Sequence, residues 1–218
     1  MKKLIIFDLD GTLLDTIEDI RYTLNDLLEK HGLKTLNREE TIKKLGYGAK
    51  KLVELATLGV DKEKFEVIYN EYVIRLATCK NERTVLYDGL DEVLKSLKKD
   101  GYKLAIVSNK PDDAVKVVCK DKLSKYGFDF VMGNLPSKFN PKPDKSCVEY
   151  CLKEMGYTKE EAVYIGDSEV DVQTFINSNV DGISVLWGFR DKDILEKTGS
   201  TRFASTGAEL YEIIKSLK

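Results

Sequence analysis

The chain has 218 residues, of which 42% are hydrophobic and 33% charged, a balance typical of a folded globular protein. Its 35 basic and 37 acidic residues give a net charge of −2, which argues against a nucleic-acid-coating protein. Its apolar runs are too short for a signal peptide or a membrane span, and its four cysteines form no C-x-x-C motif. We therefore expect a cytoplasmic protein with reduced thiols.

Five short apolar runs predict buried parallel strands. Each is too short for a helix, and each shows little alternation of polar and apolar residues, as is typical of strands covered by helices on both faces. Stretches with helical spacing separate the last four runs, at 112–122, 144–155 and 169–177. This succession predicts an α/β fold with a doubly wound, Rossmann-like parallel sheet. The predicted strands are 4–7, 104–107, 128–132, 162–165 and 183–186.

The long interval between the first two predicted strands has a different character. From residue 17 to 86 the apolar residues follow helical spacing, as Ile20, Leu24 and Leu27 do. We expect this segment to form a small α-helical cap, with hinges near 15–18 and 86–89. The predicted organisation is a core domain of residues 1–16 and 87–218, interrupted by a cap domain of residues 17–86.

The most informative stretch is Asp-Leu-Asp-Gly-Thr at residues 8–12, directly after the first predicted strand. In open α/β sheets this position faces the ligand crevice. Asp8 and Asp10 carry like charges two residues apart, and a bound cation would offset their repulsion. Carboxylate oxygens on a tight loop suit Mg²⁺. Taken alone, however, this motif is also compatible with an ordinary acidic turn.

Polar residues follow the next three predicted strands as well. Ser108, with Asn109 beside it, follows the second and is suited to hydrogen-bonding a phosphoryl oxygen. Lys142 lies between two prolines on a stiff loop after the third. Asp167 and Asp171 follow the fourth, where they could complete a divalent-cation site. Because parallel strands bring their C-terminal ends together, we expect all these side chains to converge on one crevice.

These groups, in this order, resemble the four motifs of the haloacid dehalogenase superfamily of phosphohydrolases. The helical insertion resembles the cap of its phosphoglycolate phosphatase-like subgroup. The resemblance implies that Asp8 is a nucleophile that forms an aspartyl-phosphate, that Asp10 is the general acid and base, and that Thr12 fixes the loop. It further implies that Ser108 and Lys142 stabilise the charge on the phosphoryl group. The implied Mg²⁺ ligands are Asp8, the backbone carbonyl of Asp10 and Asp167, with Asp171 supporting the site.

The cap is expected to contribute the substrate contacts, together with Asn109 of the core. Glycines allow a backbone to approach a ligand closely, so the predicted cap contacts are Gly46, Tyr47, Gly48 and Lys50. A plain turn between two helices explains the same glycines equally well. The segment Trp-Gly-Phe-Arg at 187–190 follows the last predicted strand, and we interpret it as structural, with Arg190 a candidate contact at the rim.

The resulting hypothesis is a Mg²⁺-dependent phosphatase that hydrolyses a small phosphomonoester, with 2-phosphoglycolate among the candidates. A sugar phosphomutase resembling β-phosphoglucomutase and a pyrophosphatase of the same family stay open. A phospho-accepting receiver domain fits less well, because it lacks a helical insertion and carries its acceptor aspartate on an interior strand. The expected partner is a small phosphorylated metabolite, with neither nucleic acid nor membrane, and the sequence leaves open a monomer or a homodimer.

Overall fold

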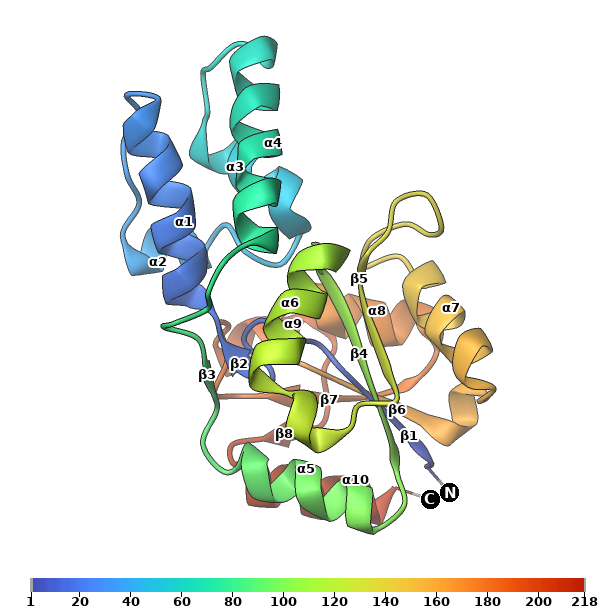
Figure 1. Cartoon of the computed structure of the whole chain (residues 1–218). Helices are drawn as coiled ribbons and strands as arrows, with labels where there is room; N and C mark the ends of the chain where they lie inside the picture. Colours follow the sequence, from blue (N-terminus) through green and yellow to red (C-terminus); the bar gives the residue numbers. More distant parts are fainter. Residues whose placement is uncertain (1, 218) are drawn as a thin grey trace.

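The computed structural model describes residues 2–217, and a six-stranded parallel sheet lies at their centre (Figure 1). The strand order is β5-β4-β1-β6-β7-β8, and β1 pairs with β4 on one side and β6 on the other. The order reverses at β1, so the loops after these three strands border one crevice. This sheet confirms the predicted α/β class. The strands are β1 (Leu4–Phe7), β4 (Lys103–Pro111), β5 (Phe130–Asn134), β6 (Ala162–Gly166), β7 (Asp181–Val185) and β8 (Phe203–Ala204).

Helices cover both faces of the sheet. Along β1, Ile5 and Phe7 point into one apolar layer and Leu4 and Ile6 into the other, and all four are fully buried. Burial on both faces explains why β1 is a continuous apolar run. The first layer contains α5 (Leu90–Lys99), α6 (Asp112–Lys122) and α10 (Gly207–Ser216), and the second contains α7 (Ser146–Met155), α8 (Glu169–Ser178) and α9 (Lys192–Thr198).

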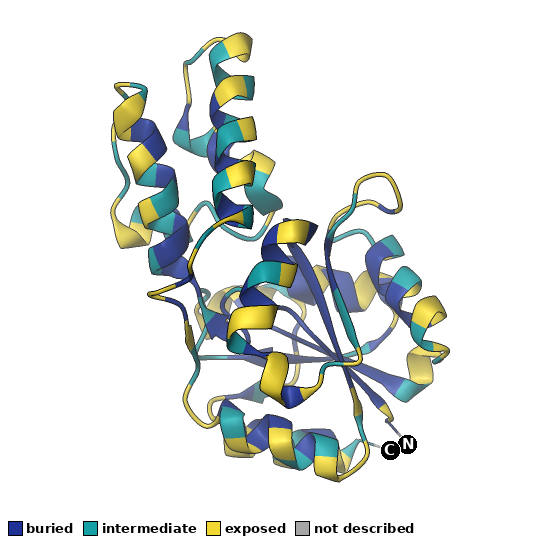
Figure 2. Ribbon diagram, in the orientation of Figure 1, coloured by how far each residue is buried: buried dark blue, intermediate teal, exposed yellow. Residues whose placement is uncertain are grey.

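Four further helices stand together away from the sheet (Figure 1). Three of them, α1, α3 and α4, share an apolar cluster that includes Leu24, Ile68 and Tyr72, and Ala114 of α6 packs against it from the core. Figure 2 shows buried residues between these helices and exposed residues on their outer faces. The chain enters and leaves this group through the antiparallel strands β2 (Leu14–Asp15) and β3 (Val85–Leu86). The helices are α1 (Ile17–Lys30), α2 (Arg38–Ile42), α3 (Gly48–Ala56) and α4 (Lys62–Ala77).

The predicted elements match the structure unevenly. β1 and α6 have the predicted bounds, whereas β5 and β7 are displaced by about two residues along the chain from the predicted runs. The sequence analysis did not identify β8, whose two residues are too few to form a pattern, nor α5, α9 and α10. Two short 3₁₀ turns complete the chain, η1 (Ser124–Tyr126) and η2 (Lys159–Glu161). Between residues 2 and 217, no helix has the length and apolar character needed to cross a bilayer.

Candidate active site

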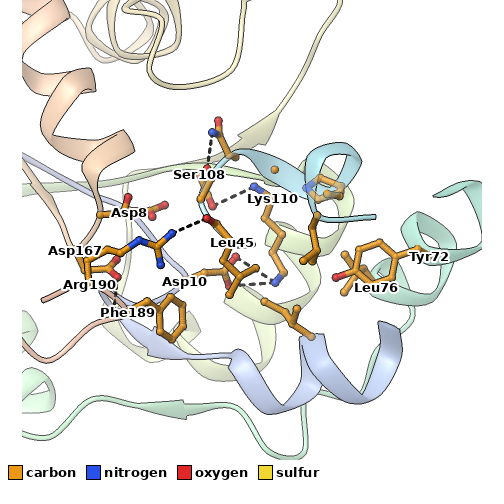
Figure 3. A pocket seen from close by; sticks show the side chains of 18 residues that line it. Asp8, Asp10, Leu45, Tyr72, Leu76, Ser108, Lys110, Asp167, Phe189 and Arg190 are labelled. Carbon is orange, nitrogen blue, oxygen red and sulfur yellow. Dashed lines mark hydrogen bonds and ion pairs between the residues drawn. The ribbon is translucent and has the colours of Figure 1, made fainter. Parts of the chain in front are cut away.

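A pocket with an empty volume of about 570 Å³ lies between the sheet and the cap helices (Figure 3). Its core wall is formed by residues at the carboxyl ends of β1, β4 and β6 and by the loop after β7, and it is largely polar. Its cap wall is largely apolar. The core wall consists of Asp8, Asp10, Ser108, Asn109, Lys110, Pro111, Asp167, Ser168, Phe189 and Arg190, and the cap wall of Ile20, Leu45, Gly46, Gly48, Ala49, Leu52, Tyr72 and Leu76.

The loop after β1 is fixed to the loops after β6 and β7. Gly11 has a φ of +88°, and a Cβ atom there would overlap the Asp167 carboxylate, so only glycine permits this approach. The Thr12 hydroxyl donates a hydrogen bond to Asp167 Oδ1 at 2.8 Å, and Trp187 Nε1 donates to the Thr12 carbonyl at 3.0 Å. These hydrogen bonds of Thr12 join the first predicted motif to the fourth and to the loop after β7.

Lys142 lies beneath Asp8 and is only 3% exposed. Its Nζ atom lies 2.9 Å from Asp8 Oδ1 and 2.7 Å from Asp171 Oδ1, and it donates a hydrogen bond to the Tyr164 hydroxyl at 2.9 Å. The contact with Asp8 is an ion pair, and among the described residues no other group donates a hydrogen bond to the buried Oδ1 of Asp8. The predicted lysine and two of the predicted carboxylates thus meet in one buried network.

The buried carboxyl groups do not ionise equally. Burial raises the pKa of Asp8 to about 7, because the Lys142 charge offsets only part of the desolvation and Asp171 and Asp10 repel further negative charge. Burial, then Asp171 and Asp8, raise the pKa of Asp167 well above its usual range. The pKa of Asp171 is lowered: burial opposes ionisation, but the Lys142 charge and its hydrogen bond prevail. Full ionisation of Asp8 and Asp167 therefore requires more positive charge than Lys142 supplies.

The geometry of these acids fits a small, hard cation. Asp8, Asp167 and Asp171 each offer one oxygen, and the three atoms lie within 4.8 Å of one another. Asp8 has a buried oxygen free of hydrogen bonds. Both oxygens of Asp171, in contrast, already accept hydrogen bonds, from Lys142 and Tyr164 on one side and from Ser168 on the other. Asp171 is thus better placed to hold Lys142 and the β6–α8 turn than to bind an ion directly.

The Asp10 carboxylate is held by two residues that the sequence analysis did not assign to the site. The Thr16 hydroxyl donates to Asp10 Oδ1 at 2.6 Å, and Lys110 Nζ lies 3.1 Å from the same oxygen. Lys110 belongs to β4 and is 8% exposed. Its position two residues after Ser108, at the carboxyl end of a strand that borders the crevice, was the available signal.

Asn109 joins three segments of the chain. Its side-chain amide donates to the carbonyls of Gly46 and Lys142, each at 2.9 Å, and its Oδ1 accepts from the Lys142 N–H at 2.8 Å. Gly48 also lies against it: a Cβ atom at Gly48, whose φ is +86°, would be 3.1 Å from the Asn109 carbonyl. Gly46 and Gly48 therefore line the pocket, and close contact with the core is one physical reason for glycine at both positions.

Tyr47 and Lys50 are not brought into this pocket. Both are exposed, and they line a separate surface groove with Leu58 and Phe65. The reason is the helical period of α3: Ala49 and Leu52, three residues apart, share the face toward the core, and Lys50 is rotated by about 100° from Ala49. Their positions therefore do not fit the expected substrate contacts in this pocket.

Arg190 has a larger role than a rim contact. Its guanidinium pairs with Glu169 at 2.7 Å and donates to the carbonyls of Ile42 and Leu45, at 3.0 and 2.9 Å. It thereby ties the loop between α2 and α3 to the core. These contacts join residues almost 150 positions apart, so no local pattern in the sequence could predict them.

Comparisons with known proteins agree with this architecture. A family model described as haloacid dehalogenase-like hydrolase matches residues 5–185. A phosphoglycolate phosphatase from Colwellia psychrerythraea is 28% identical over 98% of this chain and 97% of its own length. One from Rhodobacter capsulatus is 34% identical over 87% of each chain. A solved structure from Lactobacillus delbrueckii subsp. bulgaricus, assigned provisionally as a phosphoglycolate phosphatase, has a TM-score of 0.89 at 33% identity and covers 98% of this chain and 99% of that one.

Proposed function

The chain belongs to the haloacid dehalogenase-like hydrolase family and is a phosphatase of the phosphoglycolate phosphatase-like subgroup, and we propose that it cleaves its ester through an aspartyl-phosphate on Asp8 in the presence of Mg²⁺. The observation that carries the proposal is the position of Asp8. Its carboxylate lies at the carboxyl end of β1, beside Lys142, in the pocket that the cap helices cover. A carboxylate so placed can attack phosphorus and form a mixed anhydride that water later cleaves.

The acid–base role falls to Asp10. Its carboxylate lines the pocket and is oriented by Thr16 and Lys110. In the first step it would donate a proton to the leaving oxygen, and in the second it would accept one from the attacking water. Ser108, which lines the same wall, and Lys142 would stabilise the charge on the phosphoryl oxygens.

The cation would be held by Asp8, Asp167 and the backbone carbonyl of Asp10, with Asp171 holding Lys142 in place. Mg²⁺ bound there would screen the negative phosphate from the negative nucleophile. The fit of the site rests on the buried carboxylate of Asp8, for which Lys142 is the counter-charge, and on the raised pKa values of Asp8 and Asp167, which a nearby cation would lower.

We further propose 2-phosphoglycolate as the physiological substrate. The names of the curated relatives support this assignment, and two of them match this chain over at least 87% of both lengths.

The test is phosphate release from a panel of esters, in Mg²⁺ and in chelator. The panel contains 2-phosphoglycolate, pyrophosphate and both glucose phosphates, with glucose phosphate interconversion followed in parallel. We expect metal-dependent release that is greatest for 2-phosphoglycolate. Asp8→Asn should abolish it, a loss of at least about 10⁴-fold, because the amide is not a nucleophile.

Asp15→Asn is the matched control, since Asp15 lies in β2, at the end of the loop that follows β1, and pairs with Arg38 outside the pocket. It should retain most of the activity. Acid quenching during turnover, followed by peptide mapping, should place the phosphoryl group on the peptide that contains Asp8. Interconversion of glucose phosphates without release would assign the chain to the mutases, and turnover by Asp8→Asn would remove Asp8 as the nucleophile.

A further inference from the structure

The cap wall of the pocket contains one hydroxyl group among aliphatic side chains. Tyr72 of α4 is 1% exposed, and its ring packs in the same cluster as Ile20, Leu52 and Leu76. Within residues 2–217 its hydroxyl has no hydrogen-bond partner. The oxygen is nevertheless not fully enclosed by protein and keeps some accessible surface. Figure 3 shows it turned toward the interior of the pocket. A buried hydroxyl that opens only into a pocket is a group left for the pocket's occupant.

Lys110 lies on the opposite wall. Its two contacts within the site, at 3.1 and 3.3 Å, both go to the Asp10 carboxylate. An ammonium group has three donors, so Lys110 can bind a further acceptor without releasing Asp10. The guanidinium of Arg190, in contrast, is already bonded to Glu169 and to two backbone carbonyls. Of the two cations among the described residues that line the pocket, Lys110 is the one in contact with Asp10 and with a donor free beside it.

We propose that Tyr72 and Lys110 determine substrate specificity by binding the carboxylate of a short phosphorylated hydroxy acid. The inference rests on the proposed function, which places the leaving oxygen next to Asp10. Lys110 is in contact with Asp10, so a carboxylate one or two carbons from the ester oxygen lies within its reach. Tyr72 meets the same group from the cap. Burial raises the pKa of Tyr72, which keeps its hydroxyl protonated as a donor at neutral pH.

The largely apolar cap wall disfavours sugar phosphates. A hexose would place several hydroxyls against Ile20, Leu52 and Leu76, none of which can pair with them. Leaving such polar groups unpaired in a closed site is costly, and this cost is the usual source of strong discrimination between substrates. The aliphatic surroundings have the opposite effect on a single carboxylate, because low polarity strengthens its bonds to Tyr72 and Lys110.

The experiment compares kcat/KM for 2-phosphoglycolate and for ethyl phosphate, which has the same two carbons but no carboxylate. The wild type should prefer 2-phosphoglycolate by about 100-fold or more, and glucose 6-phosphate should be a poor substrate. Tyr72→Phe removes one oxygen and should reduce the preference about tenfold or more. Lys110→Met should slow both esters, since it also touches Asp10, and should reduce the preference further.

Tyr69→Phe is the matched control. Tyr69 lies on the same helix, but its ring stacks on Phe65 and does not line the pocket. It should change neither rate. The ratio of the two esters is insensitive to partial unfolding, which lowers both rates equally. A wild type without preference, or a preference that Tyr72→Phe leaves intact, overturns this inference and leaves the phosphatase standing. Failure to hydrolyse any ester would overturn the proposed function, and this inference with it.

Discussion

The two walls of the pocket differ in how their polar groups are satisfied. On the core wall the charged groups already have partners: Lys110 holds Asp10, and Lys142, buried behind the wall, lies between Asp8 and Asp171. On the cap wall the side chains are mostly aliphatic, and the Tyr72 hydroxyl has no partner among the described residues. The core wall is therefore organised before a substrate arrives, as electrostatic catalysis requires. The cap wall supplies shape and one polar contact, as selection between leaving groups requires.

Lys142→Met should produce the largest combined effect on stability and activity, since Lys142 is the counter-charge of two buried carboxylates. It leaves two carboxylates buried without a counter-charge, which should lower the free energy of unfolding by about 3–5 kcal/mol. Loss of charge stabilisation should reduce kcat by about 10²–10³-fold in the protein that stays folded. Urea unfolding and phosphate release from 2-phosphoglycolate measure the two effects.

Lys145→Met is the control for that variant, because Lys145 lies on the same loop with an exposed side chain that pairs with Glu149. It should change stability by less than about 1 kcal/mol. If Lys142→Met unfolds at the urea concentration of the wild type, the buried network does not organise the core wall in the way described above.

Asp8→Asn should reveal the cost of that organisation in the metal-free protein. Burial raises the pKa of Asp8 from its ordinary value of 3.8 to about 7. Between these values the unfolded chain has lost the proton and the folded protein keeps it. Stability therefore falls as pH rises through this window, by a few kcal/mol and at most about 4. An asparagine has no such proton, so in chelator the variant should be more stable than the wild type at pH 8 and lose that advantage near pH 4.

The measurement is urea unfolding of both proteins in chelator across that pH range, repeated with Mg²⁺. The added ion should stabilise the wild type at pH 8, since it binds the folded state, and should do less for Asp8→Asn. If the two proteins show the same dependence of stability on pH, then burial of Asp8 does not destabilise the folded protein as its charge forms.

The core wall could be predicted from the sequence because each of its strands ends in a recognisable residue type. Asp8, Ser108 and Asp167 directly follow short apolar runs, and the ends of parallel strands must meet. Lys142 was predicted from the stiff loop around it. Lys110 was missed, although it lies two residues after Ser108 at the same end of β4, because lysines at strand ends are mostly solvated.

The cap wall could not be predicted in this way. Tyr72 has the same helical spacing as the residues that only fill the cap, and Lys50 is next to Ala49. Which face of a cap helix turns toward the core depends on packing between segments far apart in the chain. The sequence pattern therefore predicted a helical segment here, but it assigned Tyr47 and Lys50 to a pocket that they do not line.

Arg190→Met tests whether the two walls depend on one another, and we expect its effect to be the smallest. Together with Asn109, the arginine links the core to the loop that carries Leu45 and Gly46, and its loss leaves Glu169 and two carbonyls unpaired. Stability should fall by about 1–3 kcal/mol. KM for 2-phosphoglycolate should rise several-fold, because a looser loop positions the cap wall less well, while kcat should fall less, because Asp8 and Lys142 are untouched.

The control is Arg38→Met, which removes a half-exposed arginine paired with Asp15 and Glu18 and should leave KM unchanged. An Arg190→Met variant that loses kcat at constant KM would show that the arginine supports catalysis by the core wall. Arg190 would then not act on substrate binding through the position of the cap wall.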